Sequence, residues 1–120
     1  MLVCISASMK YKDDIKRISA LLDDLQINYL LPEMDISREQ ENELPELTPK
    51  LVYEHFEKID RADAVLVINP GGYIGNSVKI EIGYARGSGK KVFFLKETGH
   101  PEIDCLAEEI LSENKLSQLK

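Results

Sequence analysis

The residue in this sequence best suited to covalent chemistry is Glu81, which follows a cluster of three glycines. A carboxylate can act as a nucleophile, and glycines let a ligand approach the backbone closely. The spacing of apolar residues predicts a helix over 78–88, and at about 100° per residue Glu81 falls inside its apolar arc. Burial raises the pKa of a carboxyl group, whereas a helix N-terminus opposes that rise. Two interpretations stay open: a functional carboxylate at a cleft, or a structural ion pair or cap.

The glycine-rich loop at residues 69–77 precedes this helix and could hold an anion. Free N–H groups at a helix N-terminus suit a phosphate, and Asn76 and Ser77 could either cap the helix or contact such a group. The loop is not a GxGxxG motif after the first strand, and it is not the GxxxxGK[ST] of a P-loop. A tight turn between strand and helix that needs its glycines is the alternative interpretation.

Four strands alternating with four helices must position these groups. Short apolar runs predict strands at 1–5, 27–31, 64–68 and 91–95, and helical spacing predicts helices over 13–25, from Thr48 and Pro49 to about Ile59, over 78–88 and over 101–111. Such alternation is typical of a parallel sheet with helices on both faces. We therefore expect a three-layer α/β, flavodoxin-like, doubly wound sheet with strand order 2-1-3-4; a fifth edge strand is an open alternative.

Ligands of a doubly wound sheet bind at the carboxyl ends of the strands, where the strand order reverses. Two loops reach that point, residues 6–10 after the first strand and 69–77 after the third. Tyr73 is either a stacking face for a base or a packed side chain. The expected substrate-binding residues are Ser6, Ser8, Met9, Asn69, Gly71, Gly72, Tyr73, Gly75 and Ser77.

Composition limits the classes of partner. The chain has 120 residues, a net charge of −6 and no basic cluster, which predicts one domain over 1–120 that does not bind nucleic acid. No apolar run is long enough for a membrane span, and Cys4 and Cys105 fit neither a disulfide framework nor a metal pattern. We expect a cytoplasmic protein without a metal ion or cofactor. The acidic segment 33–49 has no clean period, and we interpret it as a mobile loop or a lid.

The run from residue 62 to residue 95 resembles the nucleoside 2-deoxyribosyltransferase superfamily, which includes the 2′-deoxynucleoside 5′-monophosphate N-glycosidases. The similarity lies in Ala62-Asp63 before an apolar strand, the glycine loop, the EIGYA motif that begins at Glu81, and Gly89-Lys90 before another strand. By this resemblance Glu81 is the nucleophile, which forms a covalent glycosyl-enzyme on a nucleoside or nucleotide. Ser77 and the glycine loop would lie near the sugar or its 5′-phosphate, with Ser6 and Ser8 on the other wall.

The resemblance also implies a homo-oligomer, and it draws attention to His55. The family usually has an aspartate on the helix before the Ala62-Asp63 pair, and counting back gives His55 or a neighbour. Because His55 lies on the apolar face of its helix, it is either a core histidine or a ligand contact. A non-catalytic nucleotide-binding or sensing module of the same fold is the alternative function.

Overall fold

The computed structural model describes residues 1–36 and 38–120, and its centre is a parallel sheet. The sheet has five strands in the order β2-β1-β3-β4-β5, and every neighbouring pair is parallel. The expected doubly wound α/β fold is confirmed, and the open fifth strand is present at the β4 edge. The strands are β1 (Leu2–Ala7), β2 (Asn28–Leu30), β3 (Ala64–Ile68), β4 (Lys91–Phe94) and β5 (Glu109–Ile110).

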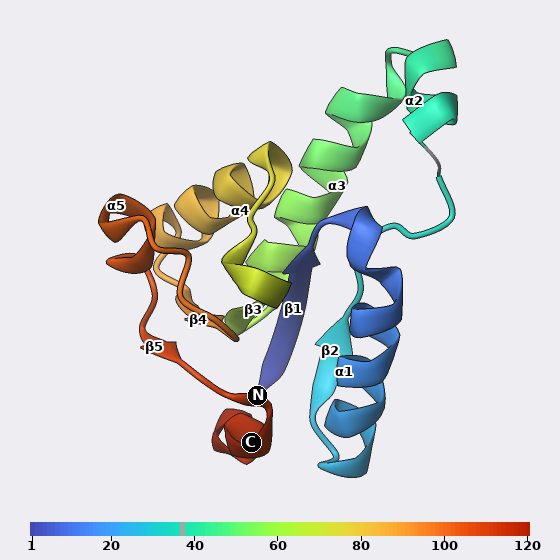
Figure 1. Cartoon of the computed structure of the whole chain (residues 1–120). Helices are drawn as coiled ribbons and strands as arrows, with labels where there is room; N and C mark the ends of the chain where they lie inside the picture. Colours follow the sequence, from blue (N-terminus) through green and yellow to red (C-terminus); the bar gives the residue numbers. More distant parts are fainter. Residues whose placement is uncertain (37) are drawn as a thin grey trace.

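Helices cover both faces of this sheet. The α-helices are α1 (Lys12–Asp24), α2 (Arg38–Glu43), α3 (Leu47–Arg61), α4 (Asn76–Gly87) and α5 (Pro101–Asp104), and the 3-10 helices are η1 (Met9–Tyr11), η2 (Pro70–Gly72) and η3 (Glu113–Leu119). Figure 1 shows α3 and α4 side by side, and α1 beside β2. No helix in the described part of the chain is long and apolar enough to cross a membrane.

The alternation of side chains along β1 divides the core into two parts. Val3, Ile5 and Ala7 pack with α1 and η3, whereas Cys4 packs with α3 and α4 on the opposite face. Because successive side chains of a strand point to opposite faces, Ser6 lies on the same face as Cys4. Cys4 and Ser6 of β1 therefore both lie on the face of the sheet that α3 and α4 cover.

The expected helix over 101–111 is wrong beyond Asp104. Only Pro101–Asp104 is helical, and the chain then turns so that Glu108 N–H donates to the Val92 carbonyl and β5 pairs with β4. Without β5, the backbone groups at the outer edge of β4 would have no partners in the sheet. Pairing of β5 with β4 is therefore favoured over continuation of the helix.

The structure also differs from the sequence predictions at the end of the first strand and in the segment 33–49. Ser6 belongs to β1 instead of the following loop, because the pairing with β3 continues to Ala7 and Ile68. The segment 33–49, expected to be irregular, contains α2 and the start of α3. Figure 1 shows α2 beyond the N-terminal end of α3 and away from the sheet. A lid function for this segment stays a prediction.

Candidate functional site

Glu81 lies in the second turn of α4, where the helix packs against α3 and over the carboxyl half of the central strands. Its side chain is 15% exposed, which agrees with its expected place in the apolar arc. Val78, Ile82 and Ala85 of the same helix are buried in the core beneath it. The carboxyl group is therefore held at the edge of the core, with limited access to solvent.

Ser6 is the first polar partner of Glu81. The Ser6 side chain is fully buried at the carboxyl end of β1, and its hydroxyl donates a hydrogen bond to Oε1 of Glu81. A buried hydroxyl needs such a partner, because an unmade hydrogen bond in the core is costly. The sequence predicted both residues for the site, and the structure brings them into contact.

His55 reaches the same carboxyl group from α3. Its ring is 6% exposed, and Nε2 lies 3.5 Å from Oε1 of Glu81. Nε2 also lies 3.7 Å from Sγ of Cys4, whose side chain is fully buried on β1. The structure shows His55 as a core residue that lies beside the candidate nucleophile, and a contact with a ligand stays a prediction. Cys4 was not predicted for the site, although its i, i+2 relation to Ser6 along one strand face was a usable signal.

Burial determines the charge state of this cluster. Burial raises the pKa of Glu81 to about 7, and the hydrogen bond from Ser6 opposes that rise. Burial, together with the positive charge of Lys58, lowers the pKa of His55 to about 4. Near neutral pH the histidine is therefore uncharged, and the carboxyl group exchanges readily between its protonated and ionised forms. A pKa near the working pH is typical of functional groups.

The same burial makes the Cys4 thiol unreactive. Burial, and then the negative charge of Glu81, raise the pKa of Cys4 to about 12. The thiolate, which is the reactive form of cysteine, is thus scarce at neutral pH. Among the described residues, no group of three or more His, Cys, Asp or Glu side chains is arranged to hold a metal ion. Cys4 is therefore not a candidate nucleophile, and Glu81 stays the predicted one.

Two glycines of the loop are required by the backbone itself. Gly71 and Gly72 have φ angles of 65° and 82°, in the left-handed region. A Cβ atom on Gly72 would also collide with the carbonyl oxygen of Glu97. The turn alone accounts for these glycines, as the alternative sequence interpretation held, whether or not a ligand also approaches them.

Asn69 already has partners within the protein. Its side chain is buried and donates to the Lys96 carbonyl at 2.7 Å, and its Oδ1 accepts the Lys96 N–H at 3.1 Å. These bonds join the loop after β3 to the loop after β4. The predicted role of Asn69 in substrate binding is untested, and its amide serves first to fix the geometry of the site.

Tyr73 lies at the mouth of the site beside the loop that follows β1. Its ring is 46% exposed and contacts the Tyr11 ring edge-on at 6.0 Å between centroids. Nζ of Lys10 lies 3.4 Å from the centroid of the Tyr73 ring, a cation–π contact. The two predicted loops therefore meet here.

The other predicted residues surround this meeting point. Ser8 begins η1, where its carbonyl accepts the Tyr11 N–H, and Met9 packs partly against the core on the α1 side. Gly75 is the N-cap of α4 and provides no side-chain cap bond, and Ser77 is exposed in the first turn. The first N–H groups of an α-helix have no intrahelical partner, which makes a helix start suited to an anion.

Two hollows flank the glycine loop, and Gly71 lines both of them. The first, of about 500 Å³, lies on the α1 side and is lined by Asp14, Arg17, Ile68, Asn69, Pro70, Gly71, Leu95, Lys96, Ser112, Glu113 and Asn114. The second, of about 430 Å³, is lined by Gly71, Gly72, Tyr73, Ile74, Lys79, Thr98, His100 and Ile103. Glu81 lines neither hollow. The hollow on the Tyr73 side is nevertheless formed in part by α4, the helix that carries Glu81.

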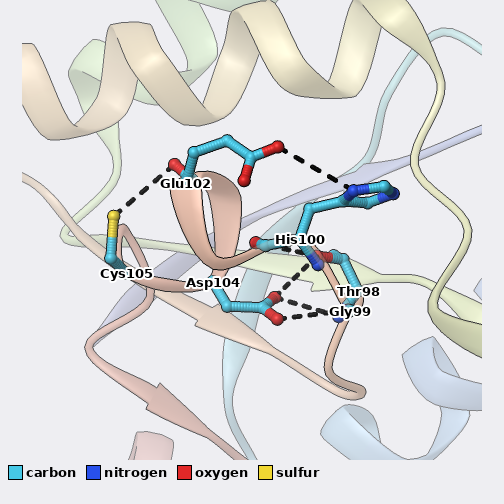
Figure 2. A network of polar contacts seen from close by, with 6 residues as sticks. All are labelled: Thr98, Gly99, His100, Glu102, Asp104 and Cys105. Carbon is cyan, nitrogen blue, oxygen red and sulfur yellow. Dashed lines mark hydrogen bonds and ion pairs between the residues drawn. The ribbon is translucent and has the colours of Figure 1, made fainter.

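A hydrogen-bond network holds one wall of the second hollow in place. Figure 2 shows Asp104 of α5 accepting bonds from the backbone of Thr98 and Gly99, at 2.9 and 3.2 Å, and from the Thr98 hydroxyl at 2.8 Å. The His100 N–H donates to the Thr98 hydroxyl oxygen at 3.1 Å. The loop between β4 and α5 thus has a defined shape, which no motif in the sequence indicated.

Comparison with solved structures relates this fold to that of a known enzyme. A 2-deoxyribosyltransferase from the psychrotolerant bacterium Bacillus psychrosaccharolyticus has a TM-score of 0.68 and 19% identity, over 100% of this chain and 93% of the other. A conserved protein from Enterococcus faecalis V583 has a TM-score of 0.61 and 13% identity, over 98% of this chain and 95% of the other. No protein-family model and no curated protein matches the sequence. These similarities show the fold that the chain shares.

Proposed function

We propose that the protein is an N-glycosidase or deoxyribosyltransferase that acts on a nucleoside or nucleotide, and that it belongs to the 2-deoxyribosyltransferase superfamily. The observation that carries the proposal is the partly buried carboxyl group of Glu81, which accepts a hydrogen bond from Ser6 at the carboxyl end of β1 and lies 3.5 Å from Nε2 of His55. The shared fold and the EIGYA motif support the same assignment.

The reaction proceeds through a covalent intermediate. A carboxylate oxygen of Glu81 bonds to the anomeric carbon while the bond from that carbon to the base breaks, and the electron pair leaves with the base nitrogen. Water or a second base then attacks the anomeric carbon, and the carboxylate departs with its electron pair. This sequence is the retaining logic of glycoside hydrolysis, with water giving hydrolysis and a base giving transfer. In this proposal Tyr73, which is exposed, stacks on the base.

The test is release of free base from a panel of nucleosides, 2′-deoxynucleosides and their 5′-monophosphates, followed by chromatography. Glu81→Ala is expected to abolish release, and mass spectrometry of a quenched reaction is expected to find a glycosyl adduct on the peptide that contains Glu81. Glu57→Gln, at an exposed position on α3, is the matched control. Base release that survives Glu81→Ala unchanged would overturn the assigned role.

A second candidate function is a non-catalytic nucleotide-binding or sensing module, which is favoured by the position of the two hollows. Both lie against the glycine loop, and Glu81 lines neither. A ligand that binds only the folded state raises the melting temperature. Binding of a nucleotide with such a rise, without base release on prolonged incubation, would favour this candidate.

We also propose that the protein is a homo-oligomer, as the family resemblance implies. Tyr53 on α3 and Ile80 on α4 are 68% and 52% exposed, and they give the α3 and α4 face apolar groups for a second copy. Size-exclusion chromatography with light scattering tests this proposal, and a monomer at high concentration would refute it.

A further inference from the structure

The two polar contacts of the Glu81 carboxyl group fall on the same oxygen. The Ser6 hydroxyl donates to Oε1, and Nε2 of His55 lies 3.5 Å from that atom. Neither contact uses Oε2. A carboxylate that attacks a carbon needs one oxygen for the new bond, so an arrangement that holds the other oxygen preserves the nucleophile.

The neighbours of His55 indicate which ring nitrogen carries its hydrogen. Nε2 lies between Oε1 of Glu81 and Sγ of Cys4, at 3.5 and 3.7 Å. Sγ of Cys4 is within donor reach of the Ile5 carbonyl at 3.9 Å, and a thiol has only one hydrogen to donate. When that hydrogen is used on Ile5 and Glu81 is ionised, both neighbours of Nε2 are acceptors. With its hydrogen on Nε2 the neutral ring has a donor to offer these acceptors, whereas a hydrogen on Nδ1 would leave the Nε2 lone pair facing two acceptors.

We propose that His55 is a positioning residue whose Nε2–H, together with the Ser6 hydroxyl, holds Glu81 by Oε1 and directs Oε2 to the anomeric carbon. This inference rests on the proposed glycosyl transfer. In the first step Oε2 bonds to the anomeric carbon as the bond from that carbon to the base breaks and the electron pair leaves with the base nitrogen. Oε1 becomes the carbonyl oxygen of the glycosyl ester. The two donors keep their bonds to it.

The same donors assist the second step. Water bonds to the anomeric carbon as the bond to Oε2 breaks, the electron pair returns to the carboxylate, and water releases a proton. The negative charge that reappears on Glu81 is shared with Oε1, where Ser6 and His55 already donate. Donors fixed in advance at a developing charge lower the barrier, because they need no reorganisation.

Three variants separate positioning from packing. Glutamine can present its amide N–H where Nε2–H lies, so His55→Gln is expected to keep most of kcat. His55→Leu fills the space without a donor and is expected to lower kcat about tenfold or more while KM stays nearly constant, since the lost bond acts after binding. Glu57→Gln on the same helix is expected to match the wild-type protein. Equal losses in His55→Gln and His55→Leu, with both variants folded, would indicate a packing role and overturn the proposal.

A measurement on the resting protein decides the proposal even if no substrate is found. We would record ¹⁵N NMR spectra of the histidine rings at pH 8.5, where Glu81 is ionised, and assign His55 by comparison with His55→Gln. The expected result is a hydrogen on Nε2 and a bare Nδ1. A hydrogen on Nδ1 would overturn the proposal, because Nε2 could then donate nothing to Glu81. The absence of base release with the Nε2–H form present would instead count against the proposed function.

Discussion

Glu81→Gln is expected to make the protein more stable at alkaline pH. Glutamine has nearly the shape of a protonated glutamate and cannot ionise. In the folded protein burial raises the pKa of Glu81 to about 7, above the ordinary value of 4.5. The stability that Glu81 contributes is therefore fully present below pH 4.5, and it is lost as the pH rises through 7. The variant avoids that loss.

The size of the effect follows from the two pKa values. A pKa that rises from 4.5 to about 7 corresponds to about 3 kcal/mol, at about 1.4 kcal/mol for each pKa unit. The variant should exceed the wild-type protein by about 3 kcal/mol at pH 8, where both folded and unfolded wild-type chains are ionised. At pH 5 the difference should fall below about 1 kcal/mol, because the folded carboxyl group is protonated and the unfolded one only partly ionised.

Urea denaturation at pH 5 and pH 8 measures this difference. At pH 8 the midpoint of Glu81→Gln is expected to lie about 1 to 3 M urea above that of the wild-type protein. Glu57→Gln, at an exposed position, is expected to change little at either pH. A variant less stable than the wild-type protein at pH 8 would refute the reasoning, because Glu81 would then be the ionised member of a structural ion pair with a charged His55.

Three further predictions concern His55, the glycine loop and Asn69. Burial lowers the pKa of His55 to about 4. The stability that the neutral ring contributes is therefore present above pH 6.5 and is lost as the pH falls through 4. Urea denaturation at these pH values should show that His55→Gln loses less stability than the wild-type protein. Gly71→Ala should cost about 1 kcal/mol for its positive φ angle, and Gly72→Ala should lower the melting temperature further, because its methyl group also meets a carbonyl of the loop after β4. Asn69→Ala should cost about 2 kcal/mol in urea denaturation, because the backbone of Lys96 loses two bonds.

The sheet could be predicted because its signals are local. Continuous apolar runs such as residues 64–68 suit strands buried on both faces, and the helices between them require a parallel arrangement. Right-handed crossovers leave few topologies, and the flavodoxin-type order 2-1-3-4 was chosen among them. A fifth strand was only an open alternative, and its residues were expected to be helical, because β5 has only two residues, pairs with the edge of β4 and shows no period of its own.

The candidate site could be predicted only in part. Helical spacing placed Glu81 in the apolar arc, and loop order placed Ser6 nearby. The contact between them joins residues 75 positions apart, which no local pattern specifies. The contact of His55 with the same oxygen depends on how α3 packs against α4, and that packing arises from tertiary structure. Cys4 was missed because a buried cysteine at a strand centre looks like any other apolar core residue.

The cost of burying Glu81 helps to separate its two interpretations. A structural ion pair would require a charged partner, but burial lowers the pKa of His55 to about 4, so the ring is neutral when the carboxyl group ionises. Ser6 contributes one hydrogen bond, which does not offset the cost of burial. If residue 81 served only to pack the core, an apolar side chain there would cost less free energy to bury than a carboxyl group. The arrangement therefore favours a carboxyl group retained for its chemistry, at a site whose other groups leave one of its oxygens free of their contacts.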